Sequence, residues 1–450
     1  MKPVGAIPPA DWMSAEPTRL VLAALQASGQ PARFVGGCVR DAVVGRLAKD
    51  IDIATALTPP QVIAALDKAG LKAIPTGIDH GTITAVAQGF PYEVTTLRRD
   101  VETDGRHATV EFTDRWEADA MRRDFTMNAL YADADGTLYD PTGGLADLNE
   151  GRVRFVGNAA RRIAEDALRI LRFFRFYAWY GEGQPDAAAI AACSGAKQDL
   201  AILSGERVWH EMSRILAAPE PAGTLSLLGS SGILQEVLPE ATRLEAVQLL
   251  ALLEASADIE PDPILRLAAA AAAPAGSAEA MVKALAARLK LSGDERKKLL
   301  GLLAPPVAIE PEMDEAAVRR ALYRLGLQGF MDLVFVTWAR MGQSADFRPQ
   351  LGVAARSTIP AFPLRGADAL EIGVQAGKRV GELLAAVEDW WIAGDFQADR
   401  KACLARLQKL AGGGAKKDSA KTAPVKKAPA AKTPATKKAP AKKKAPVKKG

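Results

Sequence analysis

Cysteine, histidine and long uncharged apolar runs are all scarce in this chain of 450 residues. The three cysteines, Cys38, Cys193 and Cys403, have neither the paired spacing of a disulfide framework nor that of a structural zinc site. No uncharged run of about 18 apolar residues occurs, and the N-terminus lacks the apolar segment of a signal peptide. We therefore expect a soluble, cytoplasmic protein that makes no membrane contact. Its length predicts two or more domains.

Basic residues are concentrated at one end of the chain, although the whole sequence carries a net charge of only +5. Residues 415–450 contain 13 lysines and one aspartate, which leaves 45 basic and 52 acidic residues in the rest, a net charge of −7. We expect the Lys/Ala/Pro-rich segment 412–450 to be disordered, because it has few bulky apolar groups to offset the entropy lost on ordering. Binding to nucleic-acid phosphates and a solubilising role explain the lysines about equally well.

A glycine pair and two aspartates make the segment 34–55 the most informative part of the sequence. Gly36 and Gly37 lie between a strand-like run and the start of a helix, where backbone amides can approach a phosphate and the helix N-terminus adds partial positive charge. Asp50 and Asp52 are two positions apart in the next predicted strand, so their carboxylates should share one face. Paired carboxylates beside a phosphate cradle suit magnesium-dependent phosphoryl or nucleotidyl transfer.

Two further residues extend this candidate site. Arg40 falls in the first turn of the predicted helix, where it could reach a triphosphate. Glu93 lies in the middle of a later strand-like run and is the best candidate for a third carboxylate. For Glu93 the alternative is an edge-strand charge that opposes aggregation. A glycine pair or an Asp-X-Asp pattern alone is common, and only their combination in a strand–helix–strand frame favours a site.

The pattern of apolar residues changes from mixed to helical along the chain. We expect a helical lead-in over residues 1–30, an α/β head with a small mixed sheet over 31–150, a helical neck over 151–240 and a helical body and tail over 241–411. Proline-rich breaks at 219–221, 260–263 and 305–306 divide the helical part. In the head and its junction the predicted strands are Phe34–Gly36, Ile51–Ala54, Thr82–Ala87, Tyr92–Leu97 and Val153–Val156, and the predicted helices are Pro59–Ala69, Ala118–Tyr131 and a long run from Asn158 through Tyr180.

Four motifs occur in the order found in a known enzyme family. In them the chain resembles the class II CCA-adding tRNA nucleotidyltransferases and poly(A) polymerases of the polymerase-β superfamily. The resemblance implies a polymerase-β-type head, Mg²⁺ held by Asp50 and Asp52, and CTP, ATP and the tRNA 3′ end as substrates; the lysine-rich tail would then contact the RNA backbone. The motifs are the glycine pair with Arg40, Asp41, Asp50 and Asp52, then Arg122–Ala129, Asp140–Leu148 and Glu165–Arg169.

The resemblance also suggests roles for the second motif. Arg123 and Asp124 would hold the sugar and phosphates of the nucleotide, and an Asp124 that accepts from a ribose 2′-hydroxyl would select ribonucleotides. Asn128, one predicted helical turn later, would lie on the same face.

The last motif carries the hypothesis about nucleotide choice. Adenine and cytosine both present an amino donor beside a ring-nitrogen acceptor, which Asp166 and Arg169 can read by accepting and donating hydrogen bonds. On a continuous helix Glu165, Arg169 and Arg172 would share one face, flanked by Asp166 and Arg175. By resemblance Arg172 and Arg175 also lie at the nucleotide. Without the family, ordinary helical ion pairs would be the simpler interpretation.

Two further segments contain paired glycines or are rich in polar residues. Gly143 and Gly144 are interpreted as hinge or turn residues between head and neck, with a plain loop nearly as good an explanation. The polar stretch 100–109 is assigned by position to the mobile loop that assists the final A addition in the family. None of the three histidines forms the His-Asp pairs of the phosphohydrolase domain that some relatives append.

Other functions stay open from the sequence. A poly(A) polymerase shares every motif, although no long basic insertion after the head is recognisable here. A specialised A-adding or CC-adding enzyme also fits. A catalytically inactive RNA-binding protein is disfavoured because Asp50, Asp52 and Arg123 are all present.

Overall fold

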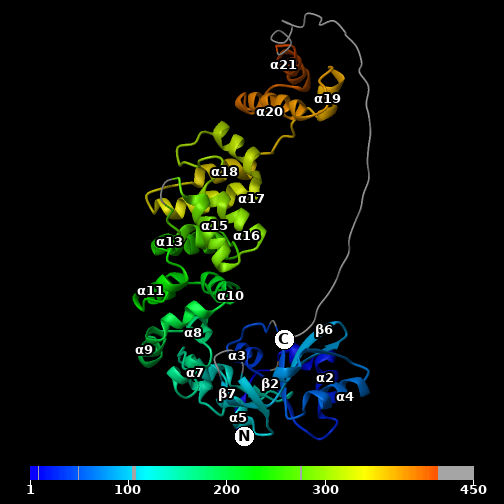
Figure 1. Cartoon of the computed structure of the whole chain (residues 1–450), viewed down its shortest axis with the longest axis vertical. Helices are drawn as coiled ribbons and strands as arrows, with labels where there is room; N and C mark the ends of the chain where they lie inside the picture. The colour runs from blue at the N-terminus through cyan, green and yellow to red at the C-terminus, as the bar shows by residue number, and fades with distance from the viewer. Residues whose placement is uncertain (9, 49, 104–107, 274–275, 414–450) are drawn as a thin grey trace, which may run out of the picture. The chain divides into compact units, whose positions relative to one another are not determined.

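The computed structural model describes residues 1–8, 10–48, 50–103, 108–273 and 276–413 (Figure 1). Contacts divide the chain into two compact units, Met1–Ile359 and Pro360–Gly450. The predicted disordered tail lies, from residue 414 on, outside the described residues, and so do residues 104–107 of the predicted mobile loop.

An eight-stranded mixed sheet forms the centre of the head, in the order β1-β10-β9-β2-β3-β6-β5-β4. The neighbours β3 and β6 run parallel, and all other neighbouring pairs in this sheet run antiparallel. A separate hairpin, β7 with β8, stands beside it. The strands are β1 Pro3–Ala6, β2 Ala32–Val35, β3 Asp52–Thr55, β4 Lys72–Gly77, β5 Thr82–Ala87, β6 Phe90–Thr96, β7 Arg98–Thr103, β8 Ala108–Phe112, β9 Tyr131–Ala132 and β10 Thr137–Tyr139.

Short helices cover this sheet and bury its apolar residues. Helix α2, within the predicted helical lead-in, buries Val21, Leu22 and Leu25. Helix α4 begins at Pro59, where proline is tolerated, and Thr58 with Gln61 closes a capping box in front of it. The helices of the head are α1 Asp11–Ser14, α2 Glu16–Gln26, α3 Gly37–Val43, α4 Pro59–Lys68, α5 Trp116–Met121, α6 Gly144–Asn149 and the 3₁₀ turns η1 Ile78–His80 and η2 Thr126–Asn128.

Four predictions differ in the structure. Residues Pro3–Ala6 of the predicted helical lead-in form strand β1, which pairs with β10. The helix predicted over Ala118–Tyr131 ends at Met121. The segment that follows enters the core, where its apolar residues are buried, and Tyr131 belongs to strand β9. The strand predicted over Val153–Val156 is reduced to a single bridge between Phe125 and Phe155. The helix predicted from residue 158 to 180 is broken at Asp166, whose backbone is extended with φ −158° and ψ 109°.

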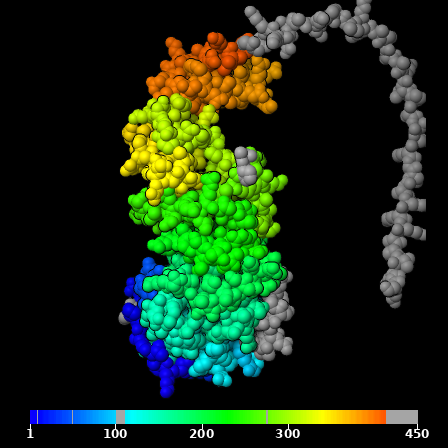
Figure 2. Space-filling view, turned by 90° about the vertical axis from the view of Figure 1, so that its left-hand side faces the viewer, coloured from blue at the N-terminus to red at the C-terminus, as the bar shows by residue number. Residues whose placement is uncertain are grey.

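The rest of the first unit is helical, and we call its helices α7–α12 the neck. Figure 2 shows the neck helices packed directly against the head. All three predicted proline-rich breaks fall at helix boundaries, and Pro221 and Pro263 are the first residues of α11 and α14. The helices are α7 Ala159–Glu165, α8 Leu168–Tyr180, α9 Ala187–Gly195, η3 Lys197–Ile202, α10 Gly205–Leu216, α11 Pro221–Ser230, α12 Leu234–Val237, α13 Leu244–Ser256, α14 Pro263–Ala270, α15 Ala278–Leu289, α16 Gly293–Leu303, α17 Glu315–Met341 and α18 Arg348–Arg356.

The second unit is also helical in its described part. It contains α19 Gly366–Glu371, α20 Lys378–Ala393 and α21 Arg400–Gly413. Trp391 is buried and packs its ring against Phe362 and Phe396. Cys403 and Leu407 are buried in the same unit. Helix α21 continues into the glycines at residues 412 and 413, which the sequence analysis assigned to the start of the tail.

The turn before α6 is a packed helix start. Asp140 accepts hydrogen bonds from the backbone amides of Thr142, Gly144 and Leu145, so its side chain fixes the turn. A Cβ atom on Gly144 would lie only 2.0 Å from the carbonyl oxygen of Thr126. Glycine is therefore required at 144 by this close approach.

We predict that Gly144→Ala destabilises the head by about 1–3 kcal/mol, because the added methyl group must displace the backbone of η2. The measurement is the midpoint of thermal unfolding, followed by circular dichroism. Gly301→Ala in α16 is the matched control, since no atom lies within 4 Å of the added Cβ there. Equal midpoints for the two variants would contradict the prediction.

Candidate active site

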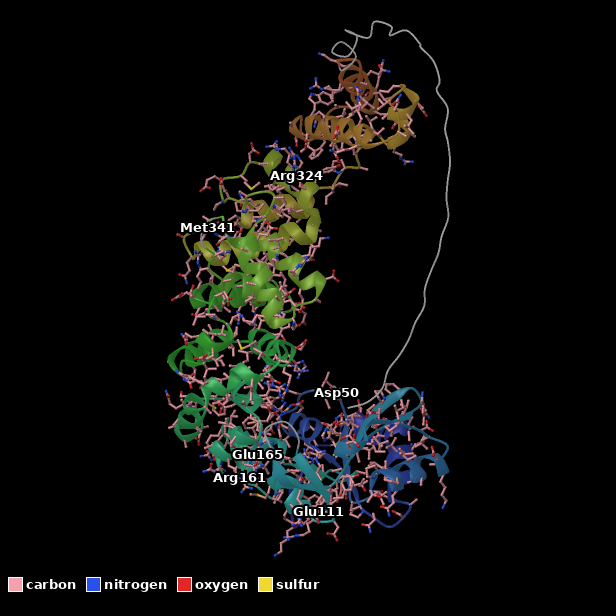
Figure 3. All side chains as sticks on the ribbon, viewed as in Figure 1. Asp50, Glu111, Arg161, Glu165, Arg324 and Met341 are labelled. Carbon is pink, nitrogen blue, oxygen red and sulfur yellow. The ribbon has the colours of Figure 1, made fainter. Side chains whose placement is uncertain are left out.

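Three carboxylates gather at the junction of β3 and β6. Asp52 begins β3 and lies beside Glu93 in the parallel register of the two strands. Asp50 precedes the strand, so the expectation that both aspartates lie within it is wrong; it projects from the edge of the head (Figure 3). Burial raises the pKa of Asp52 to about 6, with Glu93 and Asp50 adding to the shift and Arg123 and Arg40 opposing it. Negative charge is therefore in excess at Asp52.

These carboxylates fit a divalent cation by their chemistry. Carboxylate oxygens are the ligands that Mg²⁺ prefers, and a cation would stabilise the ionised form of Asp52, which burial and, to a smaller extent, Glu93 and Asp50 disfavour. In the described part of the chain, no three acidic, histidine or cysteine side chains stand close enough to form a complete metal cage. The structure thus shows acidic groups side by side that a metal ion would have to draw together.

The glycine pair lies next to these carboxylates. Gly36 adopts φ +75° and ψ −124°, and a Cβ there would lie 3.5 Å from Nη1 of Arg123 and 3.9 Å from Oδ2 of Asp52. Gly37 is the first residue of α3. A Cβ at 36 would make ordinary van der Waals contacts, so the positive φ rather than lack of space favours glycine there, and Arg123 and Asp52 both lie next to this position.

Arg40 is bonded to other protein groups in this structure. Its guanidinium donates to Oδ1 of Asn128 at 2.6 Å and to Oδ1 of Asp41 at 2.9 Å. It also stacks on the rings of Tyr180 and Phe176, at 4.3 and 5.1 Å from their centroids, and the Tyr180 hydroxyl donates to Asp41. Arg40 thus ties the head to neck helix α8, and a contact with a triphosphate stays a prediction.

Arg123 is fixed by an acidic residue that the sequence analysis did not single out. Asp119 of α5 is buried, and its Oδ2 accepts from Nη2 of Arg123 at 3.0 Å and from the hydroxyl of Tyr131 at 2.8 Å. Its Oδ1 accepts from Nε of Arg122 at 2.8 Å. Burial would raise the pKa of Asp119, but Arg123 and Arg122 hold it down at about 2. Asp119 is therefore ionised at neutral pH.

Asp124 and Asn128 meet as predicted, although no continuous helix joins them. Asn128 lies in η2 and its Nδ2 donates to Oδ1 of Asp124 at 3.1 Å. Nε of Arg172, from neck helix α8, donates to Oδ2 of Asp124 at 2.8 Å. Burial would raise the pKa of Asp124, but Arg172 and Asn128 lower it to about 2. The structure thus brings three predicted site residues into one cluster across the head–neck junction.

The break at Asp166 separates the residues of the last motif onto two helices. Glu165 ends α7 and pairs with Arg169 of α8, and Asp166 pairs with Arg207 of α10 at 2.7 Å. Figure 3 shows Glu165 beside Arg161 on the neck. The predicted single helical face of Glu165, Arg169 and Arg172 is therefore wrong.

Arg175 lies deeper in the neck than the other predicted residues. Burial lowers its pKa to about 10, and Glu211 of α10, at 3.1 Å from its Nε, opposes that shift. Glu211 is itself buried and also lies 3.9 Å from Arg172. Arg175 thus packs α8 against α10 and helps to position Arg172.

Two family models match parts of this chain. A model of the poly A polymerase head domain matches residues 32–154, and one described as the probable RNA and SrmB-binding site of polymerase A matches residues 186–244. The mitochondrial CCA tRNA nucleotidyltransferase 1 of Mus musculus is 34% identical over 392 residues, which cover 84% of this chain and 86% of the mouse protein. The chain belongs to the CCA-adding tRNA nucleotidyltransferase and poly(A) polymerase family. It is a nucleotidyltransferase.

Further relatives of this nucleotidyltransferase agree. The CCA-adding enzyme of Geobacillus thermodenitrificans is 40% identical over 215 residues, or 47% of this chain and 52% of that protein. The crystal structure of the Bacillus stearothermophilus CCA-adding enzyme in complex with CTP is similar with a TM-score of 0.70 and 28% identity, over 89% of this chain and 99% of that one. The predicted α/β head followed by helical domains is thus confirmed.

Two residues of the nucleotidyltransferase site were missed from the sequence, Asp119 and Glu211. Both are acids that become buried only because arginines from nearby turns or helices meet them. The spacing Asp119-x-x-Arg-Arg123 was a usable signal, because residues three and four apart meet on a helix. For Glu211, which comes from another helix, no local signal exists.

We predict that Asp52→Asn stabilises the metal-free nucleotidyltransferase at pH 8 by about 1–3 kcal/mol. Its folded-state pKa near 6 lies above the unfolded value of 3.8, so the wild type loses stability as pH rises between these values. The variant has no such loss, and its advantage should vanish at pH 4. Thermal unfolding in EDTA at both pH values checks this. Asp67→Asn, on the exposed face of α4, should show no pH-dependent gain; an equal response of the two variants would refute the assignment.

Proposed function

We propose that this chain adds two C residues and one A residue to the tRNA 3′ end, using CTP and ATP without a nucleic-acid template and releasing pyrophosphate. The observation that carries the proposal is the Asp52–Glu93 pair in parallel register, with Asp50 and Arg123 close enough to shift the pKa of Asp52. Relatives named CCA tRNA nucleotidyltransferase, and a similar structure that binds CTP, support it.

The family uses a divalent metal, and we assign Mg²⁺ to Asp50 and Asp52 with Glu93 as a further ligand. Bound there, Mg²⁺ supplies a lowered pKa of the tRNA 3′-hydroxyl and compensates charge on the triphosphate. The residues around it do the rest of the work. Gly36 and Gly37 let the triphosphate approach the backbone, and Arg123, already placed beside Asp52, stabilises negative charge as pyrophosphate leaves.

We assign nucleotide selection to Asp166 and Arg169. In this structure Arg207 donates to Asp166, and Arg169 donates to Glu165 and to the carbonyl oxygen of Arg162. A base that offers an amino donor and a ring acceptor can share these groups, whereas guanine and uracil would leave them unpaired at a cost of about 1–3 kcal/mol per buried group. Asp124, with Asn128 and Arg172 beside it, is assigned to the ribose 2′-hydroxyl.

The organisation and location of the chain are also proposals. We assign residues 31–150 to the nucleotidyltransferase head, to which the lead-in 1–30 adds β1, α1 and α2. We assign 151–240 to the neck and 241–411 to the body and tail, with the lysine-rich 412–450 contacting the RNA backbone. In the described part of the chain, no helix is long and apolar enough to cross a membrane. We assign the protein to the cytoplasm, although the similar mouse protein is named as mitochondrial.

Incubation of the purified protein and Mg²⁺ with a tRNA that lacks its 3′ CCA is expected to give a product three nucleotides longer only when CTP and ATP are both present. Asp52→Ala should lower incorporation by a factor of about 10² to 10³ or more, because a metal ligand is lost. Its tRNA affinity, measured by filter binding, should stay unchanged, and Asp67→Asn should behave as wild type. A product of A residues alone, of C residues alone or of a long A tract would replace the proposal with one of the alternative activities.

Arg169→Ala should weaken discrimination against UTP and GTP by about tenfold or more, because the donor to the ring nitrogen is removed. The measurement is kcat/KM for each of the four nucleotides on a tRNA that ends one residue short. Arg161→Ala is the matched control, since Arg161 also faces Glu165, at 3.6 Å, but is 77% exposed. Unchanged discrimination in Arg169→Ala would remove this residue from the selection of bases.

A further inference from the structure

Arg123 lies between two acidic residues, Asp119 and Asp52. On one side, Oδ2 of Asp119 accepts hydrogen bonds from Nε and Nη2 of Arg123, at 3.2 and 3.0 Å. On the other side lies Asp52, whose Oδ2 and the Nη1 of Arg123 both fall within 4 Å of the point where a Cβ of Gly36 would stand. Because residue 36 has no side chain, nothing from that position separates Arg123 from Asp52.

The guanidinium of Arg123 is held by hydrogen bonds on the side of Asp119. Asp119 is almost fully buried and is bonded by Arg122, Arg123 and the hydroxyl of Tyr131. Tyr131 also lies 3.3 Å from Nε of Arg123 and its ring faces the guanidinium at 5.4 Å, so the arginine is held on several sides. The charge of Arg123 acts on Asp52 as well, but the negative charges of Glu93 and Asp50 oppose its effect there.

We propose that Asp119 is a positioning residue that holds Arg123 back from Asp52 and so keeps this carboxylate available to a divalent cation. The proposal rests on the proposed function in one respect, the assignment of the cation to Asp50 and Asp52. Asp119 itself touches neither the cation nor the nucleotide. Asp119 pairs with the buried guanidinium of Arg123, which would otherwise pair with Asp52.

The consequence of losing Asp119 follows from the cost of an unpaired buried charge. A guanidinium without its counter-ion inside the head moves to the nearest carboxylate or destabilises the fold. Asp52 is the acid next to Arg123 on its open side, and arginine pairs with carboxylates in a two-pronged geometry that would occupy both oxygens. A cation binding at Asp52 would then have to displace Arg123.

The test measures binding of Mn²⁺ alone to the full chain by electron paramagnetic resonance, with Asp52→Ala defining the signal lost when the site is destroyed. Asp119→Asn should raise the Kd for Mn²⁺ by about tenfold or more, because one positive charge now competes at the site. The double variant Asp119→Asn/Arg123→Gln should return the Kd to within about threefold of wild type, since the competing charge is gone. Its activity should stay low, because Arg123 is absent.

Asp147→Asn is the matched control. Asp147 is equally buried in the head and accepts from Thr126 and Arg154, away from Asp52, so its loss should affect stability without changing the Kd for Mn²⁺. A purely structural role for Asp119 would make the double variant bind Mn²⁺ as weakly as Asp119→Asn, and this result would overturn the proposal. An unchanged Kd in a folded Asp119→Asn protein would do so as well.

Folding and the metal assignment are tested separately. If Asp119→Asn is unfolded by circular dichroism, the double variant decides alone: it must fold and bind Mn²⁺ near the wild-type Kd, and failure of either refutes the proposal. If Asp52→Ala binds Mn²⁺ as the wild type does, the cation assignment of the proposed function fails instead.

Discussion

The excess of negative charge at Asp52 is the constraint on which the rest of the site depends. It arises because β3 and β6 pair in parallel, which sets Asp52 beside Glu93 and near Asp50. The two arginines close enough to reduce it are each bonded to another acid, Arg123 to Asp119 and Arg40 to Asp41. These two arginines thus lie near Asp52 without forming an ion pair with it, and this arrangement favours a divalent ion.

The same principle governs the junction between head and neck. Charged groups there are paired with one another, Asp124 with Arg172 across the junction, and Glu165 with Arg169 and Asp166 with Arg207 within the neck. These pairs offset the cost of burying charge, and the Asp124–Arg172 pair holds neck helix α8 on the head. In the proposed function a base would have to share or replace these partners, so the specificity of the site would depend on which base does so without loss of hydrogen bonds.

Much of the fold could be predicted where the signal is local. Strand β5 was predicted with its observed bounds, because residue types alternate along Thr82–Ala87 and alternate residues are indeed buried. Helix α4 was predicted to begin at Pro59, as it does, because proline is tolerated at a helix start. The helix predicted through Tyr131 failed because burial in three dimensions overrode local propensity: Phe125 and Met127 both enter the core. The extended backbone at Asp166, which lets the last motif reach two helices, likewise has no sequence signature.

The sequence by itself determined the family, the glycine pair, the acidic residues and their order, because each depends on residue types at fixed spacing along one chain. Only the tertiary structure decided which arginine meets which acid. Asp119 and Glu211 became buried partners of Arg123 and Arg175 through packing between segments. Such pairings depend on distances across the fold, which no local spacing specifies.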